Sequence, residues 1–183
     1  MSIYEDLVIE YDLSKEKADK GEEVNKLELM FIGYTLDAVD TAKRNFKTDL
    51  DFSEESIKSV ENILDQLNKT LKSAKPSNDT ILSFAKQFAG YIGQVMRIRW
   101  GGQWVDENEY SIKNGPALKT RSQDLFLLSK VYRRMTTGQE DNIWHFYQII
   151  KGDIEGTNDL REVKIEELVV KEKKGWLNKL LGR

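Results

Sequence analysis

The stretch FAGYIGQVMRIRWGGQWVD, residues 88–106, carries an apolar helix pattern into a pair of glycines and then into a strand pattern. Ala85, Ala89 and Gly93 recur every four residues, so they share one face of a helix, and Gly90 lies beside that face. Glycine inside a helix costs about 1 kcal/mol relative to alanine, unless it lets another part of the chain approach closely. A phosphate-binding loop instead places its glycines before a helix, where N–H groups are exposed. We therefore predict that Gly90 and Gly93 serve packing, with Gly93 buried against another helix.

Helical patterns precede this stretch. Residues 13–46 have apolar side chains at helical spacing, with Gly21 as a predicted interruption. A second helix is predicted after a capping box of Asp51 and Glu54, with Ser53 as the alternative cap. Its apolar stripe consists of Ile57, Val60, Leu64, Leu67 and Leu71. Pro76 ends this pattern, and a third helix, capped by Ser77, Asn78 or Asp79, should begin near Thr80 and be buried centrally.

Short strands are expected after the glycines Gly101 and Gly102. They should lie in QWVDE (103–107) and ALKTRSQDLFLL (117–128), with a turn at Asn114-Gly115. Helices should then return, one capped by Ser129 and one after a capping box of Thr137 and Glu140, the latter with an apolar face of Ile143, Phe146, Tyr147 and Ile150. The fold class is therefore α+β, mainly helical, with a small antiparallel sheet after the central helix. We expect one domain over residues 1–150, and a linker (151–159) and C-terminal amphipathic segment over residues 151–183.

Composition restricts the class of protein. The 183 residues include no cysteine, which excludes disulfides, and no apolar run long enough to cross a bilayer. The N-terminal sequence MSIYEDLVIEYD is acidic and lacks the basic start of a secretory signal. These features predict a cytoplasmic protein. The net charge is −3, but residues 1–79 carry −7 and residues 80–136 carry +5, which favours mutual neutralisation on folding.

Three segments together resemble bacterial families known only as domains of unknown function. They are LDFSEESIKSVENILDQL (50–67), AGYIGQVMRIRWGGQW (89–104) and VYRRMTTGQEDNIWHFYQII (131–150). The shared pattern is GAYxGE followed by R…GGxW, and Gln94 stands where that pattern has Glu. The resemblance implies a bacterial cytosolic protein and implies no activity; a catalytic role of that Glu would be lost here.

Few residues favour catalysis or metal binding. His145 is the only histidine, and without a nucleophile elbow it is more typical of a structural residue at a helix surface. Asp37 with Asp40, and Glu61 with Asp65, each share a helical face, but such pairs are typical of solvated surfaces. We predict no catalytic residue, no metal site and no cofactor.

A candidate ligand site follows the central helix, where Arg97, Arg99, Trp100 and Trp104 could line a pocket. The same arginines belong to a basic set that could contact a single nucleic-acid strand. The acidic protein as a whole disfavours that role, and we expect internal ion pairs instead, with Arg97 pairing an acid of the N-terminal helices. The set is Arg97, Arg99, Lys113, Lys119, Arg121, Lys130, Arg133 and Arg134.

The C-terminal segment KKGWLNKLLGR, residues 173–183, has its apolar residues on one helical face and basic residues around them. The apolar residues are Trp176, Leu177, Leu180 and Leu181. Docking onto a protein surface is favoured over membrane contact, because the apolar face is small for a bilayer anchor. We expect a non-enzymatic protein-binding module, of adaptor or immunity type, that binds another protein or itself and no nucleic acid. The alternative is an enzyme or small-ligand binder at the candidate pocket.

Overall fold

The computed structural model describes residues 2–105 and 115–157. The chain is mainly helical, with six α-helices and a small three-stranded antiparallel sheet in this described part, which confirms the predicted α+β class. It divides into two compact units, residues 1–146 and 147–183, and each is described by itself. The predicted turn at Asn114-Gly115 falls partly outside the described residues, and the C-terminal segment 173–183 falls outside them entirely.

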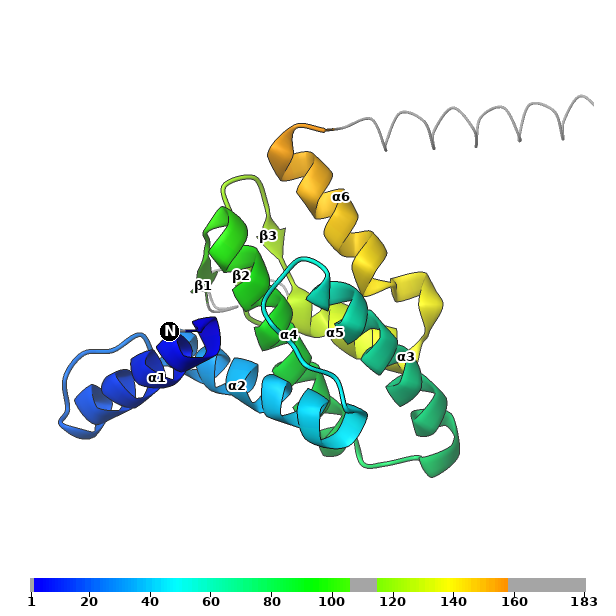
Figure 1. Cartoon of the computed structure of the whole chain (residues 1–183), viewed down its shortest axis with the longest axis horizontal. Helices are drawn as coiled ribbons and strands as arrows, with labels where there is room; N and C mark the ends of the chain where they lie inside the picture. Colours follow the sequence, from blue (N-terminus) through cyan, green and yellow to red (C-terminus); the bar gives the residue numbers. More distant parts are fainter. Residues whose placement is uncertain (1, 106–114, 158–183) are drawn as a thin grey trace, which may run out of the picture. The chain divides into compact units, whose positions relative to one another are not determined.

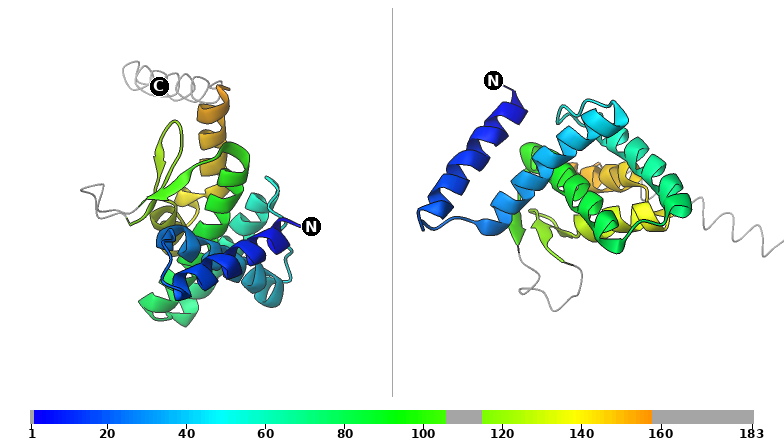
Figure 2. Two further views of the ribbon diagram at one scale, coloured as in Figure 1. Left: turned by 90° about the vertical axis from the view of Figure 1, so that its left-hand side faces the viewer. Right: turned by 90° about the horizontal axis from the view of Figure 1, so that it is seen from below.

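The first two helices, labelled in Figure 1, form an antiparallel hairpin, which the right-hand view of Figure 2 shows. Helix α1 spans Ile3–Asp19 and begins with a capping box between Ser2 and Glu5, while α2 spans Lys26–Phe46 and is capped by Asn25. Tyr4 on α1 donates a hydrogen bond to Asp40 on α2, and the Tyr11 ring lies against Gly33. The earlier residue on α1, Tyr4, thus contacts the later residue on α2, and Tyr11 contacts the earlier one, as expected for antiparallel helices. Gly21, with a φ of +78°, lies in the connection, so the predicted interruption is confirmed.

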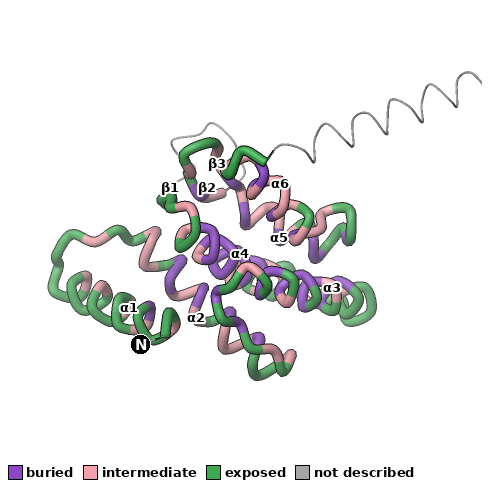
Figure 3. Tube along the Cα trace, turned by 45° about the horizontal axis from the view of Figure 1, so that its top comes forward, coloured by how far each residue is buried: buried purple, intermediate pink, exposed green. Residues whose placement is uncertain are grey.

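Helix α4, Asn78–Trp100, is the central helix of the first unit. Its cap is Ser77, one of the three predicted, whose hydroxyl accepts from the Thr80 N–H. Figure 3 shows buried backbone in the middle of this helix, and its nine buried residues all lie between Ala85 and Met96, which confirms the expected central position. It packs mainly on α2 and on α5, Leu127–Thr136. A Cβ added at Gly90 would lie 3.0 Å from the Phe31 carbonyl oxygen, so glycine there lets α4 approach the α2 backbone.

Helix α3, Ser56–Ala74, packs against α5. Its predicted capping box is wrong: the Asp51 carboxylate accepts from the Ser53 N–H instead. The alternative, Ser53, accepts from the Ser56 N–H at 3.2 Å. Helices α2 and α3 both end at a lysine with left-handed backbone, Lys47 at φ 55° and Lys75 at φ 44°, where glycine is the commoner residue.

The later caps also differ from the prediction. Ser129 lies inside α5, which begins two residues earlier. The 3₁₀ turn η2, Gln139–Asp141, separates α5 from α6, Ile143–Glu155, so Thr137 and Glu140 form no capping box. Asn142 takes the capping role, because its side-chain oxygen accepts from the His145 N–H at 2.7 Å.

The sheet has the strand order β1-β2-β3 and lies where α4 ends (Figure 2). Strand β1, Gln103–Val105, pairs with β2, Ala117–Lys119, and β2 pairs with β3, Asp124–Leu125. Trp104 is opposite Leu118, and Leu118 is opposite Leu125, which places these three apolar side chains in one row. All three are buried, so this row forms the inner face of the sheet.

In the second unit, the described residues 147–157 continue α6 and end it. The helix runs through Gly152 to Glu155, so the prediction that a linker begins at residue 151 is wrong. Gly156 has a φ of +71°, and the Thr157 N–H donates to the Gly152 carbonyl, as in a glycine-terminated helix end. Across the described ranges, every helix is too short or too polar to cross a membrane.

Candidate functional site

The glycine-rich end of α4 is a packing arrangement. A Cβ on Gly93 would lie 2.4 Å from Cζ2 of Trp104 and 3.2 Å from Cδ1 of Leu127, so the indole occupies the space that a side chain would fill. Gly93 is buried, as predicted. Its closest neighbour is Trp104 of the sheet, and Leu127 at the start of helix α5 is next, so contact with another helix is confirmed only in part. The close helix–helix approach is made by Gly90 instead.

Trp104 completes this packing from β1. Its ring stacks on Phe31 of α2, with centroids 3.5 Å apart and an interplanar angle of 6°, and only 2% of the residue is exposed. Trp104 is therefore part of the core that joins α2, α4 and the sheet. Trp100, at the end of α4, is half-buried.

The two arginines between these tryptophans are held in ion pairs. Arg97 pairs with Glu28 of α2 and also donates to the Gln94 side chain and the Gly102 carbonyl. Arg99 pairs with Glu54 at 2.9 Å. The expected pairing of Arg97 with an acid of the N-terminal helices is thus confirmed. A role of Arg97, Arg99, Trp100 and Trp104 in ligand binding stays a prediction, with Trp104 the least accessible of the four.

No protein family, curated protein or solved structure matches this chain. The resemblance to bacterial domains of unknown function therefore stays a prediction.

A buried ion-pair network links α3 to α5 and to the start of α6, and sequence reasoning missed it. Arg134 of α5 is fully buried and donates to Glu61 at 2.8 Å and to Asp65 at 2.9 Å. Glu61 also accepts from the Asn142 side chain and from the Ile143 N–H. The prediction that Glu61 lies on a solvated face is wrong, because its carboxylate serves as the buried acceptor for three separate groups.

Protonation in this network follows from its contacts. Lys69 and then Arg134 hold the pKa of Asp65 at about 2, well below its ordinary value. Burial alone would lower the pKa of Arg134, but its hydrogen bonds to Glu61 and Asp65 outweigh this effect and raise it. Asp65 and Arg134 are therefore both charged at neutral pH, as an ion pair that joins α3 to α5 requires.

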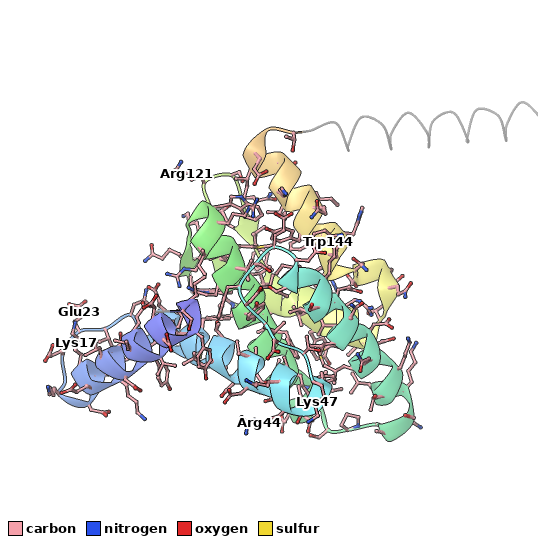
Figure 4. All side chains as sticks on the ribbon, in the orientation of Figure 1. Lys17, Glu23, Arg44, Lys47, Arg121 and Trp144 are labelled. Carbon is pink, nitrogen blue, oxygen red and sulfur yellow. The ribbon has the colours of Figure 1, made fainter. Side chains whose placement is uncertain are left out.

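The remaining basic residues are also mostly paired. Lys130 and Arg133 share Asp141, at 2.8 Å and 3.3 Å. Five of the eight residues in the predicted basic set therefore have internal carboxylate partners, as expected. Arg121 extends outward between β2 and β3 (Figure 4), and Lys113 lies outside the described residues.

Other chemistry is sparse in the described part of the chain. Asp37 and Asp40 lie near each other on α2, and partial burial followed by the Asp40 charge raises the pKa of Asp37. Asp40 accepts from Tyr4 and pairs with Arg44. Among residues 2–105 and 115–157, no three His, Cys, Asp or Glu side chains converge as metal ligands would. His145 is exposed at the first turn of α6.

The most unusual surface is on α1. Its buried and half-buried residues, Tyr4, Leu7, Val8, Tyr11, Ser14 and Ala18, recur at helical spacing and form the side toward α2. The opposite side, which we call the outer face of α1, consists of Asp6, Ile9, Leu13 and Glu16 and is exposed, as Figure 3 shows for most of this helix. Ile9 and Leu13 are 45% and 53% exposed.

Acidic residues flank this apolar pair. Residues 1–14 include Glu5, Asp6, Glu10 and Asp12 and no lysine or arginine. Five large apolar residues are exposed in the described structure, and four of them, Ile3, Ile9, Leu13 and Met30, lie on α1 or the start of α2. The apolar surface is thus concentrated on this hairpin, whose far end carries Lys17 and Glu23 (Figure 4).

Proposed function

We propose that this protein is a non-enzymatic binding module, of adaptor or immunity type, that binds a protein partner through the outer face of α1. The observation that carries the proposal is the exposure of Ile9 and Leu13 on the side of α1 opposite α2. A bacterial, cytosolic setting belongs to the same proposal. Scattered exposed apolar residues are ordinary on proteins, but their concentration on one protruding hairpin is typical of an interaction surface.

The arrangement of the hairpin supports this role. Helix α1 packs principally on α2, and Leu7 is its one buried residue. A helix in this position adds little to the core of the first unit, while it offers two full turns of side chains to a partner. Apolar residues at i and i+4 with polar neighbours are the pattern by which a helix is recognised in complexes.

The alternative, a ligand pocket at the end of α4, has weaker support. Arg97 and Arg99 are engaged by carboxylates, and Trp104 is stacked in the core. A ligand there would have to displace existing ion pairs, and each displaced charge would need a new partner.

Site-specific photo-cross-linking in cells tests the proposal. A benzophenone amino acid is placed at Ile9 or at Leu13, and at Ile98 as the control, since Ile98 is similarly exposed (47%) but lies on α4. We expect an adduct with a discrete protein from both α1 positions and a much weaker one from Ile98. Equal adducts from all three positions, or none from α1, would contradict the proposal. A small molecule retained by the purified protein in native mass spectrometry, and lost in Arg99→Ala, would favour the alternative.

A further inference from the structure

The outer face of α1 has a chemistry that restricts what can cover it. Its centre is apolar, with Ile9 and Leu13 one helical turn apart. The charged residues of α1 before Leu13 are all acidic, Glu5, Asp6, Glu10 and Asp12, and lysines begin only at Lys15, so the N-terminal half of the helix is acidic. A complementary segment would present a short apolar stripe with basic residues beside it and no acid, because like charges across a contact are unfavourable.

One segment of this same chain has that composition. Residues 173–183 contain Lys173, Lys174, Lys179 and Arg183 and no acidic residue. Their apolar residues, Trp176, Leu177, Leu180 and Leu181, follow an i, i+1, i+4, i+5 spacing, so in helical register they would share one face. This stripe is about two helical turns long, so it is long enough to cover both Ile9 and Leu13, which are one turn apart.

We propose that the outer face of α1 binds residues 173–183 of a second copy of this chain, and that two copies exchange these segments reciprocally. This inference rests on the proposed function and names its partner. Reciprocal exchange is isologous: it closes a symmetric dimer, leaves neither face uncovered and does not propagate into a filament.

The chain is long enough for the exchange. Residues 158–172 separate the described part of the chain from the basic segment, and these fifteen residues can extend over as much as about 50 Å. A connection of this length allows residues 173–183 to bind a second copy.

Two weak contacts suffice in such a dimer. A two-turn apolar stripe on two exposed side chains is a small interface, and each contact alone should be weak. Once one segment is bound, the second contact forms at the effective concentration set by the intervening chain. Opposite charges at an exposed interface are screened by salt, so the association should weaken as ionic strength rises.

Sedimentation velocity of the full-length protein over a range of concentrations tests the proposal. We expect the wild type to form a species of twice the chain mass, with an association that weakens in high salt. Leu13→Glu and Leu180→Glu should each weaken association at least about tenfold, since each places a charge in an apolar contact. Ile98→Glu, at an equally exposed apolar position on α4, should associate as the wild type does.

Charge reversal identifies the two surfaces as partners. Glu10→Lys with Asp6→Lys, or Lys174→Glu with Lys179→Glu, should each weaken association, and the four changes combined should restore much of it. A combined variant as weak as either pair would overturn the assignment. Circular dichroism of each variant verifies that the fold is retained, because all these positions are exposed or outside the described core.

Other outcomes would overturn the proposed dimer without contradicting the proposed protein-binding function. A wild type of single-chain mass at every concentration excludes the dimer, and a photo-cross-link from Leu13 to a different protein would still support the binding function. Binding of the wild type to vesicles containing anionic lipid, lost in Leu180→Glu while the mass stays that of one chain, would assign residues 173–183 to a lipid surface instead.

Discussion

Position 93 shows how one missing side chain determines the packing of three elements. Because Gly93 has only a hydrogen as its side chain, the surface of α4 leaves room for the Trp104 ring. That ring in turn stacks on Phe31. Glycine is needed here for space, since its backbone is helical and a left-handed conformation is not involved.

We predict that Gly93→Leu lowers the free energy of unfolding by about 3 kcal/mol, through overpacking against Trp104. The measurement is urea unfolding followed by circular dichroism. Ser83→Leu serves as the control, because Ser83 is an exposed residue on the same helix. An unfolding midpoint for Gly93→Leu equal to that of Ser83→Leu would show that the Trp104 ring is not fixed in this position.

The Tyr91 hydroxyl holds the loop that precedes α3. Its hydroxyl accepts from the Phe52 N–H at 2.8 Å and donates to the Ser56 hydroxyl at 2.7 Å. Phe52 has a φ of +63°, unusual for a bulky residue, so this hydrogen bond fixes an otherwise unfavourable backbone. Burial raises the pKa of Tyr91 to about 12.

Tyr91→Phe should lower the free energy of unfolding by about 1–3 kcal/mol at neutral pH, because the buried Phe52 N–H loses its acceptor. In the wild type the folded-state pKa of Tyr91 lies above its unfolded value. The corresponding stability is therefore complete below pH about 10 and is lost as pH rises toward about 12. Denaturant unfolding between pH 8 and 11.5 should show a steeper alkaline loss in the wild type than in Tyr91→Phe. Tyr132→Phe, which changes a surface hydroxyl, should keep the wild-type slope.

At the scale of elements, the Arg134 network determines how α3, α5 and the start of α6 are joined. One guanidinium binds two acids of α3, and Glu61 also accepts from the first N–H of α6. The first N–H groups of a helix have no hydrogen-bond acceptor within the helix, and here the buried Glu61 carboxylate is the acceptor for one of them.

Arg134→Leu should destabilise the protein by about 3–5 kcal/mol, because Glu61 would remain as a buried carboxylate without its cation. Thermal and urea unfolding measure this change. Arg133→Leu is the matched control, since Arg133 is adjacent but has a side chain that is 58% exposed. A loss in Arg134→Leu no larger than in Arg133→Leu would contradict the buried pairing.

At the scale of the whole molecule, burial is unevenly distributed along the chain. Helix α4 has nine buried residues, while α1 has one. Amide hydrogen exchange depends on how readily each region opens, and few buried contacts mean easier opening.

We therefore expect the amides of residues 5–19 to exchange much faster than those of residues 85–96, when native-state exchange is followed by mass spectrometry. Slow exchange of α1 at low protein concentration would show that another part of the chain, besides α2, covers this helix. Slowing of α1 exchange as protein concentration rises, absent in Leu13→Glu, would agree with the proposed dimer.

Sequence periodicity predicted most helices and the small sheet, because burying one face of each element leaves a repeating pattern. It missed contacts that depend on distant pairing. The stacking of Trp104 on Phe31 joins residues far apart in the chain, and nothing local to either residue indicates it. Glu61 and Asp65 have the spacing of a solvated face, and only the position of α5 reveals Glu61 as buried. Cap residues were predicted poorly, since several polar residues near each helix start compete and tertiary packing decides among them.

The lysines with left-handed backbone at the ends of α2 and α3 also mark positions where the protein can be stabilised. Lys75 ends its helix at φ 44°, a conformation that is less costly for glycine than for lysine. Lys75→Gly should therefore raise the melting temperature, with a gain of up to about 1 kcal/mol that calorimetry can measure. Such a stabilised background would offset part of the loss expected for Arg134→Leu and would let the variants be compared under one set of conditions. A lower melting temperature would indicate that the lysine side chain contributes contacts that outweigh its backbone strain.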